Sequence, residues 1–326
     1  MKWDRLAGNA SAKEMLSGYI DSGRLPHALL IEGPIGSGRR RFARQIARAV
    51  ICSDQTGNNP CGICSHCHKA LAGSHPDIEE IEGEGKSHTI AVGTIRDLRE
   101  RAYIHPNEAK KRVMIIADAQ DMNEAAQNAL LKVLEEPPAH SLFILTCENR
   151  SQMLSTIQSR TLCVSLGGVA EEEALPVVME LQPECTEEDA RKALRLFSGI
   201  IGQAVKGLQG GDLTAVIEQT AAMAEGMVKP EELSLLRLTA TLDKSLWDGV
   251  LCGLQLAARD ALAVGTDTVL SPSPEATAAL AAHLTRQQLM AVIREIDELA
   301  VYRRRYMNAT LFSVVAAARL RQAAGK

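Results

Sequence analysis

The sequence predicts an α/β domain with a parallel sheet, followed by a half of the chain that is all-α. Short apolar runs alternate with helical patterns in the first half, which is typical of a parallel sheet covered on both faces. From residue 171 onward only helical periodicity remains. Aromatic residues make up 3% of the 326 residues, and alanine and leucine are frequent, which favours a helix-rich protein of two or three domains.

The elements of the first half can be predicted in order. An amphipathic helix is expected over residues 9–20, with Ser11 as its cap. A buried strand at Leu29–Ile31 leads into a glycine-rich turn and a helix over residues 42–50. Further strands are expected at residues 77–81, 113–117, 142–147 and 162–166. A helix with a clear apolar stripe precedes the strand at 142–147, and Pro137-Pro138 ends it.

The domain boundaries follow from these patterns. We expect the sheet domain to span residues 1–166 and a small helical unit to span residues 167–208. The Gln-Gly-Gly-Asp run at residues 209–212 has the composition of a linker. Residues 212–326 then form a separate helical bundle.

Charge and hydropathy restrict the partners of the chain. The formal net charge is −4, so a generally basic nucleic-acid-binding surface is excluded and any DNA contact must come from local patches. No apolar run is long enough to span a membrane, and the first residues lack the apolar core of a signal peptide. We therefore expect a cytoplasmic protein without membrane contact, in which stable disulfides are uncommon.

The turn after the first strand resembles a phosphate-binding P-loop that has lost its functional side chains. The glycines Gly33, Gly36 and Gly38 keep the shape of the loop. Arg39 stands where the phosphate-binding lysine belongs, and Arg40 stands where the Mg²⁺-binding hydroxyl belongs. A strand-to-helix turn that binds no nucleotide is favoured over a residual phosphate site in which Arg39 still reaches a phosphate.

The third predicted strand gives a second, independent sign of lost ATPase chemistry. Its end, Asp118, matches the Mg²⁺-linked aspartate of a Walker B strand. The next residue is Ala119, where ATPases of this class carry a glutamate that activates water. Hydrolysis by this chain is therefore not expected, and Asp118 can equally be read as an ordinary residue at the end of a strand.

Four cysteines form a compact cluster after the P-loop helix. Cys52, Cys61, Cys64 and Cys67 have the spacing C-x8-C-x2-C-x2-C. Four thiolates form a closed tetrahedral zinc site without an open position for catalysis, so the favoured interpretation is structural zinc. The alternatives are a redox pair and thiols without a ligand. His66 and His68 lie close enough in sequence to replace a cysteine.

Four motifs together make a specific resemblance. They are the run Asn128–Pro137, the Ser159-Arg160 pair, the Leu25–Ala28 segment and the four-cysteine insert. With them the chain resembles the clamp-loader branch of the AAA+ ATPases over nearly its whole length. The resemblance implies a RecA-like AAA+ domain with a zinc insert, a small helical lid and a C-terminal helical collar that mediates oligomerisation. The stretch Arg303–Asn308 is similar to an asparagine-bearing helix of that collar.

The resemblance also implies roles for single residues. Arg160 matches the arginine finger that reaches the ATP site of a neighbouring motor subunit, although Thr161 replaces the cysteine of the family motif. Thr146 matches the position called sensor 1. Gly202 stands where motor subunits carry the sensor 2 arginine. The P-loop lysine, the hydroxyl, the glutamate and the second sensor are thus all replaced, whereas the finger is kept.

These features imply a stationary subunit without ATPase activity of its own in a bacterial replicative clamp loader, part of the DNA polymerase III holoenzyme. The implied partners are gamma/tau motor subunits and a clamp-opening delta subunit in a hetero-pentamer, and, through the complex, the sliding clamp and primed DNA. The alternative is a motor subunit that hydrolyses ATP. A zinc-dependent DNA-binding protein is a third reading, supported by the cysteines alone. Arg40, Arg44 and Arg48 more readily form a solvated or intersubunit face than a DNA contact, because no aromatic residues interleave with them.

Overall fold

A computed structural model describes residues 1, 3, 6–54, 60–85, 88–209, 213–231, 233–263, 271–304 and 308–325. The chain divides into two compact units, Met1–Val169 and Ala170–Lys326. Among the described residues, no helix is long and apolar enough to cross a membrane.

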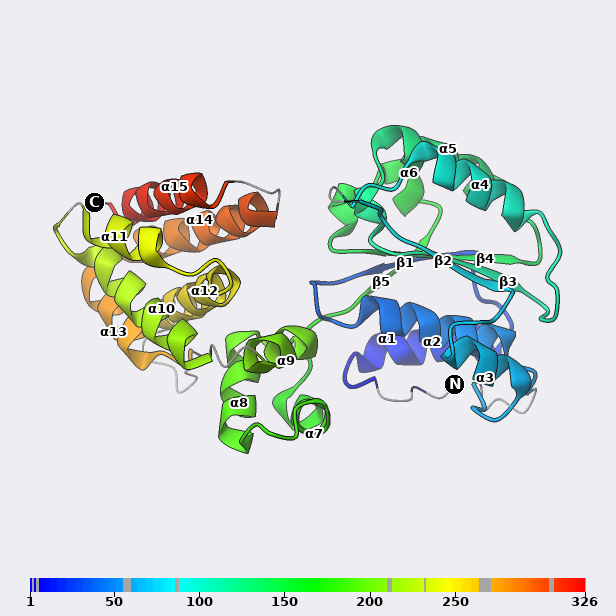
Figure 1. Ribbon diagram of the computed structural model, residues 1–326, viewed down its shortest axis with the longest axis horizontal. Helices are drawn as coiled ribbons and strands as arrows, with labels where there is room; N and C mark the ends of the chain where they lie inside the picture. The colour runs from blue at the N-terminus through cyan, green and yellow to red at the C-terminus, as the bar shows by residue number, and fades with distance from the viewer. Residues whose placement is uncertain are drawn as a thin grey trace. The chain divides into compact units, whose positions relative to one another are not determined.

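The first unit is built on a five-stranded parallel sheet (Figure 1). Its strands are β1 (Ala28–Glu32), β2 (Ile78–Ile81), β3 (Arg112–Ile116), β4 (Ser141–Cys147) and β5 (Leu162–Ser165). They lie in the order β2-β3-β4-β1-β5, so β1 is between β4 and β5. All five predicted strands are confirmed, and the predicted parallel sheet is confirmed with them.

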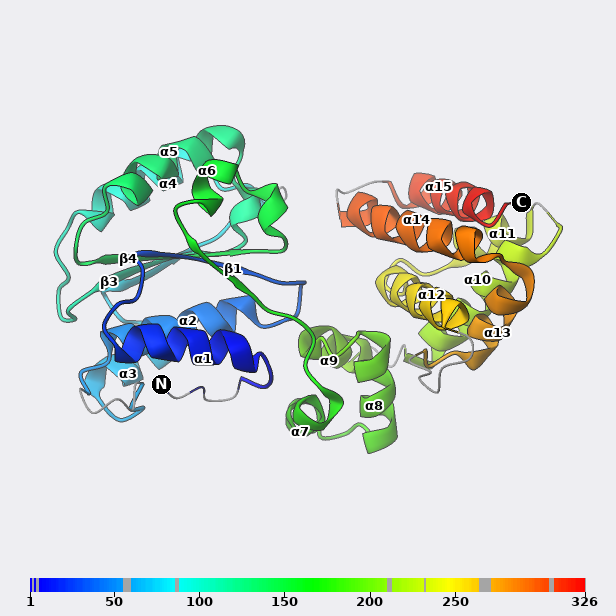
Figure 2. The same cartoon turned by 180° about the vertical axis from the view of Figure 1, so that it is seen from behind.

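Helices cover both faces of this sheet (Figure 1, Figure 2). One face carries α1 (Ala10–Asp21), α2 (Arg39–Ile51) and α3 (Ser65–Leu71), and the other carries α4 (Val92–Ala102), α5 (Glu124–Glu135) and α6 (Ser155–Gln158). Short 3-10 turns η1 (Ala119–Asp121) and η2 (Arg150–Gln152) follow β3 and β4. The apolar runs of β1, β3 and β4 are explained by this covering, because a parallel sheet buries the side chains on both faces.

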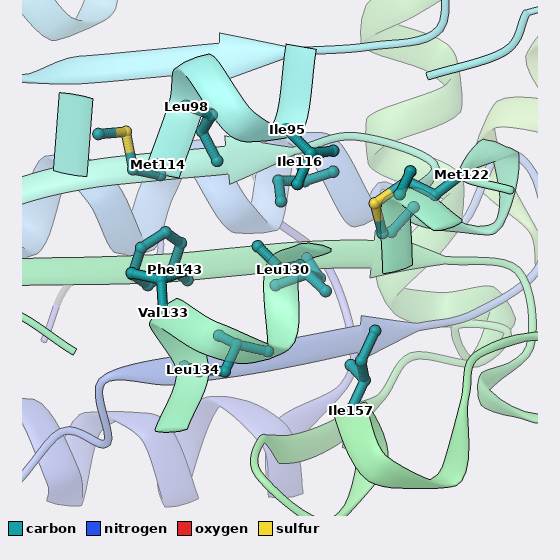
Figure 3. Close-up of a cluster of buried hydrophobic side chains, with 14 of the residues drawn as sticks. Ile95, Leu98, Met114, Ile116, Met122, Leu130, Val133, Leu134, Phe143 and Ile157 are labelled. Atoms are coloured by element: carbon teal, nitrogen blue, oxygen red, sulfur yellow. The ribbon is translucent and has the colours of Figure 1, made fainter. Parts of the chain in front are cut away.

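The core is divided into two clusters by the alternation of side chains along each strand. On the α4 and α5 face, Met114, Ile116 and Phe143 pack against Leu98 and Leu130 (Figure 3). On the other face, the intervening strand residues pack against helices α1 and α2, and this cluster includes Leu29, Ile31, Val113, Ile115, Ile144, Leu16, Phe42 and Ile46. Packed side chains thus lie on both faces of the sheet.

The two ends of α5 follow local signals, whereas the start of α1 does not. The Asn123 side chain accepts a hydrogen bond from the Ala126 N–H at 2.9 Å and caps α5, and the Pro137-Pro138 pair follows its end. The predicted Ser11 cap is wrong, because α1 begins at Ala10 and Ser11 lies inside its first turn. The residue before the helix is Asn9, in the left-handed conformation, and its side chain accepts from the Gly167 N–H at 2.9 Å instead of capping.

The second unit contains helices only, within its described residues. They are α7 (Glu171–Leu181), α8 (Glu187–Leu196), α9 (Ile201–Gln209), α10 (Leu213–Val228), α11 (Leu233–Thr241), α12 (Trp247–Leu262), α13 (Pro274–His283), α14 (Arg286–Arg304) and α15 (Ala309–Ala323). Helices α7 to α9 pack together, and α10 to α15 form a bundle with α14 beside α15 (Figure 2). Trp247 and Phe312 meet edge to face in that bundle, with ring centroids 4.8 Å apart. Residues 210–212 of the predicted linker lie outside the described residues, so the division into lid and collar stays a prediction.

Candidate functional site

The P-loop turn connects β1 to α2 and has a backbone that requires glycine. Gly36 and Gly38 have φ values of 86° and 88°, in the left-handed region that other residues rarely adopt. A Cβ on Gly33 would lie 2.7 Å from the carbonyl oxygen of Leu166, the residue after β5, so this close approach also requires glycine there. The turn therefore requires glycine at positions 33, 36 and 38, whereas positions 39 and 40 carry arginine.

Arg39 folds back into this turn. Its side chain is only 8% exposed, and its Nη2 lies 2.7 Å from Asp118 Oδ1. Its Nη1 donates to the carbonyl oxygen of Gly33, the first residue of the turn. The guanidinium at the lysine position is therefore engaged by the chain's own polar groups.

Arg40 takes the other oxygen of the same carboxylate. Its Nη2 lies 2.8 Å from Asp118 Oδ2, and its Nη1 pairs with Glu82 at the end of β2. Burial lowers the pKa of Arg40, but the hydrogen bonds to Asp118 and Glu82 outweigh it and raise that pKa overall. Both oxygens of Asp118 are thus bound by guanidinium groups, which occupy the ligand atoms that Mg²⁺ prefers.

Asp118 is held in place by its backbone as well. It follows β3 in the left-handed conformation, with φ 51°, and its N–H donates to Thr146 Oγ1 at 2.9 Å. Thr146 is fully buried on β4, which lies beside β3 in the sheet. Sequence positions 118 and 146 therefore meet at the strand ends, beside the P-loop arginines. Ala119, next to Asp118, is buried and provides no carboxylate.

Arg160 lies away from these contacts, on the surface after α6. Its Nη1 donates to the Thr156 carbonyl oxygen at 3.0 Å and to Ser159 Oγ at 3.4 Å. Its Nη2 lies 2.8 Å from Glu135 Oε1, at the end of α5. The side chain is 35% exposed. Among the described residues, none of its hydrogen bonds or ion pairs involves Arg39, Arg40 or Asp118, so it does not complete the chain's own P-loop site.

The four cysteines converge around the start of α3. Their Sγ atoms all lie within 4.8 Å of one another, and Cys52 and Cys64 are 4.0 Å apart. Four thiolates on one tetrahedral zinc ion, with Zn–S of about 2.3 Å, would be about 3.8 Å apart, which these positions fit. Cys52 ends α2 and Cys64 caps α3, so both anchor to regular structure. Residues 55–59, between the first two cysteines, lie outside the described residues.

Protein donors surround these sulfur atoms. The Cys61 N–H donates to Cys52 Sγ and the Cys67 N–H donates to Cys64 Sγ, each at 3.4 Å. Burial raises the pKa of the Cys67 thiol to about 12. Burial acts in the same direction on Cys64, but hydrogen bonds from Ser53 outweigh it and lower that pKa to about 5. Cys64 therefore forms a thiolate more readily than Cys67 does, and a bound metal ion would hold its cysteine ligands in the thiolate form.

Comparison with known proteins gives the family. Residues 8–169 match the family model described as DNA polymerase III, delta subunit. Over 286 residues the chain is 30% identical to DNA polymerase III subunit delta' of Escherichia coli (strain K12), a match that covers 87% of this chain and 84% of that protein. The chain belongs to the delta-prime family of DNA polymerase III clamp-loader subunits.

Similarity to gamma/tau subunits is confined to part of each protein. DNA polymerase III subunit gamma/tau of Mycobacterium tuberculosis (strain ATCC 25618 / H37Rv) is 37% identical over 156 residues, which are 48% of this chain and 27% of that protein. The chain thus covers 27% of the length of that relative. Among solved structures, a gamma subunit-related protein of Thermotoga maritima aligns with 95% of this chain at 20% identity and a TM-score of 0.44.

This delta-prime family member also has a second cluster of metal-binding residue types. His66, His75 and Glu108 each place a ligand atom within 4.8 Å of the others. However, His75 Nδ1 accepts from the Asp77 N–H at 3.0 Å, so the proton of the neutral ring lies on Nε2, which donates to His66 Nδ1 at 2.9 Å. Burial lowers the pKa of His75 and favours this neutral form. The ring then has no lone pair left for a metal, and the cluster is a hydrogen-bonded pair.

Sequence reasoning missed several of these contacts in the delta-prime family member. Arg39 and Arg40 were expected to be poor replacements for the lysine and the hydroxyl of a P-loop. Their joint pairing with Asp118 was not predicted, because Asp118 is 79 positions from Arg39 and 78 from Arg40, and no local pattern records the contact. The partner of Arg160, Glu135, lies in the quoted motif Asn128–Pro137 and was not singled out. His66 was considered as a zinc ligand, whereas its Nδ1 is hydrogen-bonded to His75.

Proposed function

We propose that the chain is a stationary, non-hydrolysing subunit of a bacterial replicative clamp loader and supplies Arg160 to the ATP site of a neighbouring motor subunit. The observation that carries the first part is the double pairing of Asp118 with Arg39 and Arg40. To bind Mg²⁺·ATP in the usual way, the site would have to break two charge-assisted hydrogen bonds of this carboxylate. It would also have to extract a buried guanidinium and would still lack a carboxylate at position 119 to activate water.

The second part rests on the placement of Arg160. The side chain is partly exposed, and it is anchored to the surface through Thr156 and Glu135. A guanidinium in such a position can stabilise the negative charge that develops on a γ-phosphate brought by another subunit. We accordingly propose gamma/tau motor subunits and a delta subunit as partners in a hetero-pentamer, which reaches the sliding clamp and primed DNA as a complex.

We propose structural zinc at Cys52, Cys61, Cys64 and Cys67. Support comes from the convergence of the four sulfur atoms and from the N–H groups directed at two of them. A site with four thiolates has no open position, so its function would be to fasten the segment between α2 and α3.

A motor subunit that binds and hydrolyses ATP is the second candidate, because gamma/tau relatives share 37% identity with this chain over 156 residues. Titration of the isolated protein with a fluorescent ATP analogue and Mg²⁺ separates the candidates. The stationary subunit should show no saturable binding below about 1 mM, the upper end of ordinary enzyme KM values, and no phosphate release. Saturable micromolar binding with turnover would establish the motor subunit instead.

The finger is tested by Arg160→Ala in a reconstituted loader. An arginine finger contributes roughly 10³-fold or more to the rate at its site, so total ATPase activity should fall by the share that this one site carries. Arg101→Ala is the matched control, because Arg101 is 41% exposed and also pairs with a glutamate, Glu79. Equal ATPase activity and clamp loading for wild type and Arg160→Ala would refute the role of the finger.

A further inference from the structure

We propose that Glu135 is the positioning residue of Arg160: its carboxylate holds the guanidinium in the orientation in which it meets the neighbour's nucleotide. The inference rests on the proposed role of Arg160 as a finger. Glu135 is the last residue of α5, and its Oε1 lies 2.8 Å from Arg160 Nη2. The two residues are brought together by packing of α5 on α6, since 25 residues of sequence separate them.

The segment that carries Arg160 is also anchored through helix α6. Ile157, in the middle of the one-turn helix α6, is fully buried in the core cluster on the α5 face (Figure 3). Gln158 Nε2 donates to the carbonyl oxygens of Arg150 and Met153, each at 2.9 Å. The Thr156 carbonyl oxygen that receives Arg160 Nη1 is therefore fixed in space. Glu135 adds a second fixed point, so the planar guanidinium is held at both terminal nitrogens.

These contacts hold the guanidinium without using all of its donors. A guanidinium has five N–H groups, and Arg160 directs three hydrogen bonds or ion pairs at Thr156, Ser159 and Glu135. Within the described residues, its Nε–H has no hydrogen-bond partner. Arg160 therefore keeps donors for the oxygens of a phosphate. A contact that sequestered the guanidinium would leave no such donors, whereas one that positions it does.

Both members of the pair are substantially exposed, Arg160 at 35% and Glu135 at 49%. Exposed ion pairs contribute little to stability, so the contact is not explained as a major support of the fold. Its consequence lies in the side-chain freedom of Arg160, because an arginine that is ordered before its phosphate arrives loses less entropy on binding. Removal of the carboxylate should therefore slow the neighbour's hydrolysis without removing the finger.

The test compares four reconstituted loaders that carry wild type, Glu135→Gln, Arg160→Ala or both changes. Glu135→Gln should lower kcat for ATP hydrolysis less than Arg160→Ala does, by roughly tenfold at the affected site, and should leave KM for ATP unchanged. In the Arg160→Ala background the same change should have no further effect. Glu136→Gln is the control, because Glu136 is the exposed neighbour of Glu135 and its carboxylate has no hydrogen bond or ion pair in the described part of the chain.

The outcomes are distinguishable. If Arg160→Ala slows the loader but Glu135→Gln does not, the positioning role is wrong and the finger stands. An increase in turnover with Glu135→Gln would show sequestration and overturn the proposal. If Glu135→Gln lowers turnover equally in the wild-type and Arg160→Ala backgrounds, Glu135 acts independently of Arg160, and the proposal is overturned as well. If Arg160→Ala itself has no effect, the proposed function fails and the positioning role fails with it.

Discussion

At the scale of single residues, the Asp77 side chain joins the edge strand β2 to the loop before β3. It is fully buried before β2, and its carboxylate accepts from the N–H groups of Asn107, Glu108 and Ala109 at 2.6, 2.8 and 2.8 Å. Its carbonyl oxygen accepts from the Val113 N–H at 2.8 Å. One residue thus fastens the loop before β3 to the start of β2.

These contacts predict a pH-dependent loss of stability for Asp77→Asn. An amide offers one oxygen in place of two, so a buried N–H loses its acceptor, and the free energy of unfolding should fall by roughly 1–3 kcal/mol at pH 7. Burial raises the pKa of Asp77, but the three backbone N–H groups outweigh it and lower that pKa. The contribution of the carboxylate is therefore complete above the unfolded pKa of about 3.9 and disappears as the pH falls through the lower folded pKa.

Urea unfolding of wild type and variant between about pH 7 and pH 3 checks this sign, since the titration lies at and below the unfolded pKa. The difference between the two proteins should be constant near neutral pH and shrink in acid. Asp97→Asn is the control, because Asp97 is exposed on α4 and has no hydrogen bond or ion pair among the described residues. A difference of the same size at every pH would contradict the proposed role of the charge.

At the scale of elements, the features that depend on local sequence pattern could be predicted from the sequence. The runs that became β1, β3 and β4 are largely apolar because both faces of the sheet are covered there, and such runs can be recognised without a structure. Strand β2, Ile-Glu-Glu-Ile, is only half-buried and carries a weaker signal. The Pro137-Pro138 pair marked the end of α5 for an equally local reason. By contrast, the order β2-β3-β4-β1-β5 depends on how distant segments pair, which no single run records.

The contacts of the candidate site belong to the same non-local class. The motif positions Arg39, Asp118 and Thr146 could be aligned with an ATPase pattern, but their mutual hydrogen bonds depend on β1, β4 and β3 lying side by side.

Ser11 shows the converse error, in which a local cap signal was overridden. The chain enters α1 through Asn9 in a left-handed conformation, and the Asn9 side chain is bound to Gly167. A tertiary contact thus decided where that helix starts.

At the scale of the whole molecule, the two compact units should respond differently to loss of the metal. All four cysteines of the cluster lie in Met1–Val169, and the ends of α2 and α3 carry two of them. Helix α2 also forms part of the core beneath the sheet and carries both P-loop arginines. Since a metal that binds only the folded state stabilises it by mass action, zinc should stabilise this unit and not Ala170–Lys326.

Thermal unfolding with and without a chelator tests this expectation. Protein purified without chelator should hold about one zinc per chain, as expected for a site with four ligands. Its removal should cost the first unit roughly 2 kcal/mol or more, which lowers the Tm of that unit by about 4 °C or more. Cys64→Ser should reproduce the loss of both metal and stability, whereas Cys185→Ser, in the second unit and outside the cluster, should retain the metal. A chain that contains no zinc, or one whose first unit unfolds at the same temperature after zinc is withdrawn, would contradict structural zinc at this cluster.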